Sequence, residues 1–233
     1  MDRSDGQLVA PAGLVPRSSG EVRRGWEGVG IASTGARAAL VGLLGLTLGV
    51  LTAYGQAWLP QELGSLANSS GSWASLAFLL ALFGTNHRIA GMLGFLAFIT
   101  LLGEYVLGAE FRGDPSSSSL IAFWGLAAVV AGPVLGLGAH WLKTDRGYLA
   151  AVGIGVMCGV LIGEGVYGLT FIADTTYPPY WWGEIAVGVV LLGYVAARRL
   201  GELKPAAVAV VCSLIVAAAF LGIYSQELIS FFP

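Results

Sequence analysis

The chain has little charge: only 11% of its 233 residues are Asp, Glu, Lys or Arg, whereas 56% are hydrophobic. An ordinary soluble domain is roughly 25% charged. The formal net charge is −2 and no basic patch is interleaved with aromatic residues, which argues against nucleic acid as a partner. The scarcity of charge therefore indicates a membrane protein whose surroundings are the lipid bilayer.

Residue types that bind metals or carry catalysis are also scarce. Cys158 and Cys212 each lie inside an apolar stretch, which predicts small core residues rather than a disulfide. His87 and His140 are predicted on the opposite membrane side from the glutamates of the spans, so no metal site is expected. The chain has no His-Glu-x-x-His, Gly-x-Ser-x-Gly or phosphate-binding loop. We expect neither an enzyme nor a bound cofactor.

Hydrophobic residues occur instead in seven blocks, most of them about twenty residues long, which is the length that a helix needs to cross a membrane. The blocks cover roughly 37–59, 72–85, 89–108, 119–142, 147–172, 181–199 and 205–225. The second block is short and fits a thin span, a tilted partner of the third block or a re-entrant segment. The pattern predicts an all-α polytopic transmembrane bundle over residues 36–233, preceded by a disordered polar cytoplasmic tail over residues 1–35.

The basic residues favour seven crossings. With seven, all Lys and Arg residues except Arg112 fall on one side of the membrane. Omitting the short second block would place Lys143 and Arg146 on the wrong side. Cytoplasmic loops carry an excess of Lys and Arg. We therefore expect seven spans in the cell membrane, with a cytoplasmic N-terminus and an extracytoplasmic C-terminus.

Glycine is abundant, with 35 residues, and in two blocks it recurs at every fourth position. These glycines are Gly45, Gly49, Gly155, Gly159 and Gly163. Glycines at this spacing line one helix face and admit a neighbouring helix closely. We interpret the faces as packing seams within the monomer, with a homodimer seam or a sliding surface as alternatives. Gly132 and Pro133 predict a kink in the fourth block.

Three glutamates, Glu104, Glu164 and Glu184, lie in or at the edge of spans that contain no Lys or Arg except at their ends. Glu164 is the deepest, ~13 Å below the predicted outer surface, whereas Glu184 is predicted to open the sixth block, where the helix dipole favours a carboxylate. A membrane acid without a cationic partner is protonated, hydrogen-bonded, or faces a watery cavity or a bound cation. Polar and aromatic candidates for the same pocket are Tyr167, Tyr105, Gln56 and Trp124.

The sequence around two of these acids is repeated. "LLGEYVLG" at 101–108 and "LIGEGVYG" at 161–168 share Leu, Gly, Glu, Val and Gly at matching offsets. Because the two blocks have the same predicted direction, they could present Glu104 and Glu164 to one cavity, as repeated units do in many transporters. Coincidence is the alternative, since Leu, Gly and Val dominate the composition.

Four stretches carry a resemblance to a known family: "LTAYGQAWLP", "LANSSGSW", "FWGLAAVVAGPVLGLGAHWLK" and "GEGVYG". They resemble a family of small bacterial integral membrane proteins known only as a domain of unknown function, over about residues 38–200. The resemblance implies a multi-pass membrane protein, and it brings no assigned activity or ligand.

The sequence thus predicts an integral membrane protein that binds or transports a cation or small solute through an outward-facing polar pocket, with Glu164, Glu104 and Tyr167 as its main binding residues. A homo-oligomer or a transporter partner is compatible with this function. The alternative is a non-enzymatic accessory subunit that packs against a partner through its glycine-rich helix faces and keeps its acids protonated.

Overall fold

The computed structural model describes the backbone of residues 19–113 and 116–224, and the side chains from residue 34 onward. Within these ranges every regular element is helical, which confirms the predicted all-α fold. The elements are α1 (Ser19–Trp58), α2 (Gln61–Asn68), α3 (Ser70–Ala81), α4 (His87–Phe111), α5 (Ser118–Thr144), α6 (Tyr148–Phe171), α7 (Pro178–Val195), the π-helical turn η1 (Ala196–Leu200) and α8 (Leu203–Tyr224).

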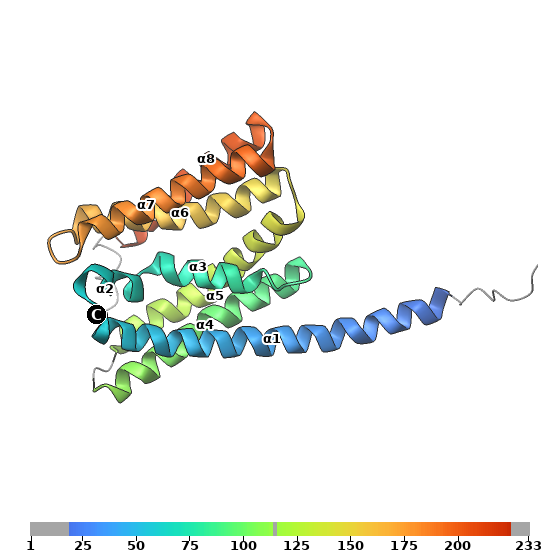
Figure 1. Ribbon diagram of the computed structural model, residues 1–233, viewed down its shortest axis with the longest axis horizontal. Helices are drawn as coiled ribbons and strands as arrows, with labels where there is room; N and C mark the ends of the chain where they lie inside the picture. The colour runs from blue at the N-terminus through green and yellow to red at the C-terminus, as the bar shows by residue number, and fades with distance from the viewer. Residues whose placement is uncertain (1–18, 114–115, 225–233) are drawn as a thin grey trace, which may run out of the picture.

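Six of these helices are long and apolar enough to cross a membrane: α1, α4, α5, α6, α7 continued by η1, and α8. The short second block is α3, whose twelve residues cover about 18 Å. Figure 1 shows that α3 starts beside α2 at one end of the bundle and leads to the turn before α4 at the other end. The pair α2–α3 thus takes the place of the predicted second span as a broken element, and the expectation of seven crossings stays a prediction.

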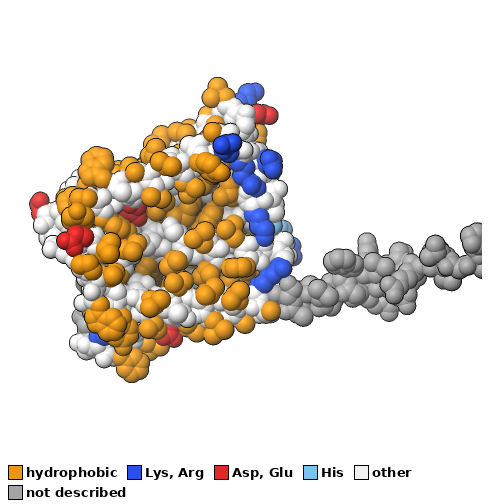
Figure 2. All heavy atoms as spheres, viewed as in Figure 1, with side chains coloured by type: hydrophobic (Ala, Val, Ile, Leu, Met, Phe, Trp, Pro, Cys, Tyr) orange, Lys and Arg blue, Asp and Glu red, His pale blue; other side chains and the backbone are white. Residues whose placement is uncertain are grey.

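The two ends of the bundle differ in charge. Turns 82–86, 145–147 and 201–202 lie at one end, which we call the basic end because Arg88, Lys143, Arg146 and Lys204 are in or next to these turns. Figure 2 shows Lys and Arg side chains gathered at this end, while the flank of the bundle is largely hydrophobic. The opposite end holds α2 and the connection between α6 and α7, and is called the α2 end. This separation of charge agrees with the predicted pattern of loops.

The N-terminal segment differs from its prediction. Helix α1 begins at Ser19, so residues 19–35, predicted as the second half of a disordered tail, are helical. Residues 1–18 lie outside the described residues.

The predicted glycine faces lie at contacts between helices of the same chain. A Cβ on Gly159 of α6 would lie 2.6 Å from the Cβ of Val216 in α8, and Gly155 and Gly163 meet the same helix. Gly45 and Gly49 of α1 lie in the same way against α4. A side chain at these positions would push the paired helices apart, so glycine is what permits their close packing.

Helix α6 is the centre of the bundle. It contacts α3, α5, α7 and α8, and two thirds of its most apolar window is buried. A core cluster that includes Phe78, Leu93, Leu135 and Met157 joins α3, α4, α5 and α6. Helix α5 is continuous through Pro133, and the kink at Gly132 and Pro133 stays a prediction. This packing holds the short helix α3 against α6 in the interior of the protein.

Candidate functional site

The broken element α2–α3 is interrupted at Ser69, whose backbone is extended with φ −86° and ψ 132°. A helix start leaves its first four N–H groups without partners inside the helix. The hydroxyl of Ser69 accepts a hydrogen bond from the amide of Ser72 at 3.1 Å. The amide of Ser70 donates to Oε1 of Glu164 at 2.7 Å, and that of Gly71 donates to Oε2. A carboxyl group from the C-terminal third of α6 thus caps the buried start of α3.

A second acid, Glu184 of α7, lies at the same helix start. The Ser69 hydroxyl is 2.8 Å from Oε2 of Glu164 and 3.1 Å from Oε1 of Glu184. A hydroxyl has one proton to donate, so Ser69 donates its hydrogen bond to the closer acid, Glu164. Oε2 of Glu184 is buried and has no hydrogen-bond partner among the described residues. The exposed fractions of Glu164 and Glu184 are only 5% and 7%, so both acids belong to the interior.

Gly71 makes this close approach possible. A Cβ at this position would collide with Oε1 of Glu184 and lie 2.8 Å from Oε2 of Glu164. Any larger residue would therefore displace the carboxyl groups from the first turn of α3.

Two tyrosines complete the polar cluster. The hydroxyl of Tyr224, in α8, lies 2.8 Å from the hydroxyl of Ser70, and that of Tyr180, in α7, lies 3.2 Å from the hydroxyl of Ser72. Helices α6, α7 and α8 each contribute a polar side chain to the first turn of α3. The start of this short helix is consequently the point where most of the buried polar contacts of the bundle meet.

Glu164 also lines a cavity of about 530 Å³, here called the aromatic cavity. Seven aromatic side chains line it: Trp73, Tyr105, Phe123, Trp124, Tyr167, Trp181 and Tyr224. None of its described lining residues is Lys, Arg or His. Its volume is that of a typical small-molecule pocket.

Polar groups are held in fixed positions at one side of this cavity. The hydroxyl of Tyr105 donates to Oε1 of Gln56 at 3.2 Å, and Nε2 of Gln56 donates to Oδ1 of Asn68 at 2.9 Å. The ring of Trp73 lies 5.3 Å from that of Tyr105 and 5.4 Å from that of Trp124, measured between centroids. Nε1 of Trp73 is buried without a partner among the described residues. The lining of the cavity thus includes several ring faces and an indole whose donor is unpaired among the described residues.

The structure brings together most of the residues that the sequence singled out. Glu164, Tyr167, Tyr105, Gln56 and Trp124 all line the aromatic cavity. Their role in binding stays a prediction, because the placement alone does not identify a ligand.

The other two acids lie elsewhere than predicted. The Cβ of Glu104 lies beside Gly49 of α1, and Glu104 lines neither the aromatic cavity nor the second cavity described below, so the expectation that it shares a cavity with Glu164 is wrong. Glu184 is the seventh residue of α7, beyond its first turn, so the dipole of its own helix does not explain it. It meets the start of α3 instead.

Sequence reasoning missed Ser69, Ser70, Gly71, Trp73 and Tyr224. The segment "PQELGSLANSSGS" has the composition of a loop, and most of it is helix α2 and the start of α3. The available signal was "SSGS" directly before an apolar run, since Ser is a preferred helix cap. Nothing in the sequence indicated that the cap would also be supplied by an acid ninety-five residues away.

A second cavity, of about 660 Å³, lies between α1, α3 and α7, and Glu184 is among its lining residues. We call it the membrane-side groove. Glu164 and Glu184, joined by Ser69, thus separate two cavities of different character.

The fold and this site define a multi-pass helical membrane protein with a broken helix whose buried start is capped by an acid from another helix. The chain belongs to the Family of unknown function (DUF6518), which matches residues 30–229. The resemblance found in the sequence is confirmed over a longer stretch. No curated protein and no solved structure matches the chain.

Replacing Glu164 by Gln should destabilise the protein. The amide NH₂ cannot accept a hydrogen bond, so at least one of the donors of Ser69, Ser70 and Gly71 loses its acceptor. A buried donor left unpaired costs about 1–3 kcal/mol. We expect a lower thermal unfolding midpoint in detergent for Glu164→Gln. Glu104→Gln, the same change at a partly exposed position, is the matched control and should melt like the wild type; equal midpoints for both variants would contradict the capping role.

Proposed function

We propose that the protein binds a small solute with a cationic ammonium group in the aromatic cavity and moves it across the membrane. The observation that carries this proposal is the convergence of seven aromatic rings and Glu164 on one cavity without a cationic side chain among its described lining residues. The faces of aromatic rings attract cations, and aromatic cages recognise quaternary ammonium groups. The proposal is a binding and transport function, with no catalysis.

The charge balance at the start of α3 supports a cationic ligand. A helix N-terminus carries about half a positive charge, which the carboxylate of Glu164 compensates. Glu184 adds a second acid, and the hydrogen-bond partners of the pair, Ser69, Ser70 and Gly71, are all uncharged. Two neighbouring buried carboxyl groups disfavour each other's ionised form, and a bound cation would favour it. Because the oxygens of Glu164 are already occupied by protein donors, Glu164 acts on the solute through its charge.

The broken helix supports transport rather than binding alone. In many transporters, discontinuous helices form the substrate site, and one part of the bundle moves against the rest around it. Here the interruption at Ser69 lies beside the aromatic cavity, and Ser70 lines that cavity. A movement of α2 and α3 relative to α6 would open or close the site.

The alternative of an accessory subunit is less well supported by the packing. It relied on glycine-rich faces being free for a partner. In the structure those faces meet α8 and α4 of the same chain. The partner interface would need a different surface.

The binding proposal is tested by titrating the purified protein in nanodiscs with choline and with its neutral isostere 3,3-dimethyl-1-butanol. We expect choline to bind and the isostere to bind at least tenfold more weakly, because only the cation is attracted to ring faces and to the acid pair. Trp124→Leu should weaken choline binding by about tenfold, the equivalent of a cation–π contact of roughly 1–2 kcal/mol.

Trp182→Leu is the matched control for that variant. Trp182 lies in α7, is 63% exposed and does not line the aromatic cavity. Its replacement should leave choline binding unchanged. Equal binding of choline and the isostere, or equal losses in both Trp variants, would overturn the proposal.

We further propose that the basic end faces the cytoplasm of a cell membrane and the α2 end faces outward, following the excess of Lys and Arg in cytoplasmic loops. Single cysteines at the exposed positions Ser118, at the α2 end, and Thr144, at the basic end, test this orientation. In intact cells a membrane-impermeant maleimide should label Ser118→Cys and should label Thr144→Cys only after permeabilisation. The wild type, with Cys158 and Cys212 inside spans, is the background control. The reverse labelling pattern would contradict the orientation.

A further inference from the structure

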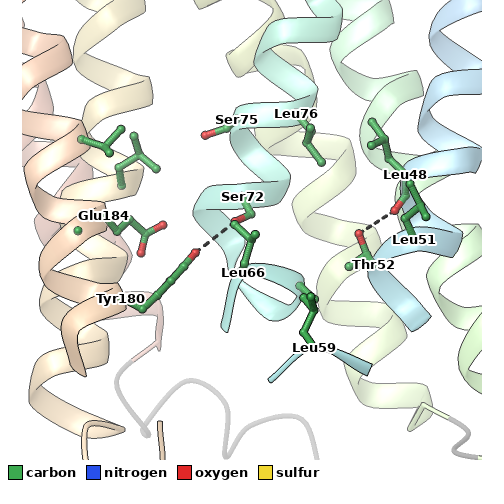
Figure 3. A pocket seen from close by; sticks show the side chains of 14 residues that line it. Leu48, Leu51, Thr52, Leu59, Leu66, Ser72, Ser75, Leu76, Tyr180 and Glu184 are labelled. Carbon is green, nitrogen blue, oxygen red and sulfur yellow. Dashed lines mark hydrogen bonds between the residues drawn. The ribbon is translucent and has the colours of Figure 1, made fainter. Parts of the chain in front are cut away.

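The membrane-side groove is an apolar cavity on the flank of the bundle. Figure 3 shows α3 at its back, with α1 on one side and α7 on the other. Most of its lining is aliphatic, and three of these side chains, Leu51, Leu66 and Val187, are at least half exposed. Exposed aliphatic side chains on the flank of a membrane bundle face lipid, so a molecule dissolved in the bilayer can reach this groove without passing through water.

One wall of the groove carries the acid whose second oxygen has no partner. Figure 3 shows Glu184 and Tyr180 projecting from α7 toward Ser72 of α3. Tyr180 and Ser72 are hydrogen-bonded to each other at 3.2 Å. Oε2 of Glu184 is buried without a hydrogen-bond partner among the described residues. A buried polar group left unpaired is costly, and in a membrane protein an acid in this state marks a functional position.

We propose that the membrane-side groove binds an amphiphilic primary amine from the bilayer, with its alkyl chain along the aliphatic lining and its ammonium group on Oε2 of Glu184. An ammonium group supplies the missing hydrogen-bond donor. Its positive charge also favours the ionised form of the Glu164–Glu184 pair, whose hydrogen-bond partners in the protein are uncharged. A neutral alcohol would supply only the donor, and a quaternary ammonium only the charge.

The lining residues of this site differ from those of the aromatic cavity. Glu184 lines the groove and not the aromatic cavity, and Glu164 lines the aromatic cavity and not the groove. The two sites also prefer different head groups, because ring faces attract a quaternary ammonium, whereas Oε2 of Glu184 requires an N–H donor. Failure of one proposal is therefore distinguishable from failure of the other.

The test uses the full chain in nanodiscs of zwitterionic lipid and a photoreactive primary alkylamine that carries a diazirine in its chain. Mass spectrometry should locate the label on groove-lining segments of α1, α3 and α7. Dodecylamine should compete with the label at concentrations at least tenfold below those of dodecyltrimethylammonium and dodecanol. Choline, the probe for the aromatic cavity, should not compete.

Three variants separate specific binding from partitioning into lipid. Glu184→Gln should remove the preference for dodecylamine, because the amide carries no charge and offers a weaker acceptor. Val187→Trp should block labelling by filling the groove, and Val189→Trp, on the other side of α7 and similarly exposed, should not. The Val variants keep the test decisive if Glu184→Gln does not fold.

The proposal is overturned by either of two results. Label spread evenly over all lipid-facing helices, unchanged by Val187→Trp, would mean that the probe only dissolves in the bilayer. Label confined to the groove but displaced equally by amine, quaternary ammonium and alcohol would mean that the groove holds alkyl chains and that Glu184 selects nothing.

Discussion

The carboxyl group of Glu164 at the start of α3 holds together a segment that is too short to be stable alone. A twelve-residue helix is marginal in isolation, and free N–H groups inside a membrane each cost several kcal/mol. Glu164 accepts hydrogen bonds from Ser69, Ser70 and Gly71 and so satisfies the donors that the interruption at Ser69 leaves open. The start of a short helix can therefore lie buried inside the bundle, and residues on either side of Ser69 line both cavities.

The same arrangement gives the two acids different tasks. Glu164 is engaged by backbone and hydroxyl donors and fixes the position of α3. Oε1 of Glu184 lies 3.1 Å from the hydroxyl of Ser69, which also contacts Glu164. Oε2 of Glu184 has no hydrogen-bond partner among the described residues, so Glu184 can still accept a hydrogen bond from a ligand. Both oxygens of Glu164 accept hydrogen bonds from the protein, so its predicted role in binding is one of charge, whereas Glu184, which the sequence explained by the dipole of its own helix, has an oxygen left for a ligand.

Composition and block length predicted the bundle well, because seven apolar stretches in 233 residues leave few other arrangements. Five lining residues of the aromatic cavity were also found, Glu164, Tyr167, Tyr105, Gln56 and Trp124, whereas Ser70, Trp73 and Tyr224 were missed. The pairing of Glu164 with Glu184 could not be predicted, because it depends on which helices are neighbours in space. The repeated "GExV" pattern suggested Glu104 instead, but its helix, α4, packs on α1, α3 and α5.

Amide hydrogen exchange of the segment around residues 69–76 tests the capping contact most directly. If Glu164 accepts the amides of Ser70 and Gly71, these two amides exchange slowly in the wild type although they begin a helix. In Glu164→Gln, which keeps a single acceptor oxygen, the exchange of at least one of the two amides accelerates by at least tenfold, while amides in α8 keep their rates. Fast exchange of both amides in the wild type, or equal rates in the wild type and the variant, would contradict the account.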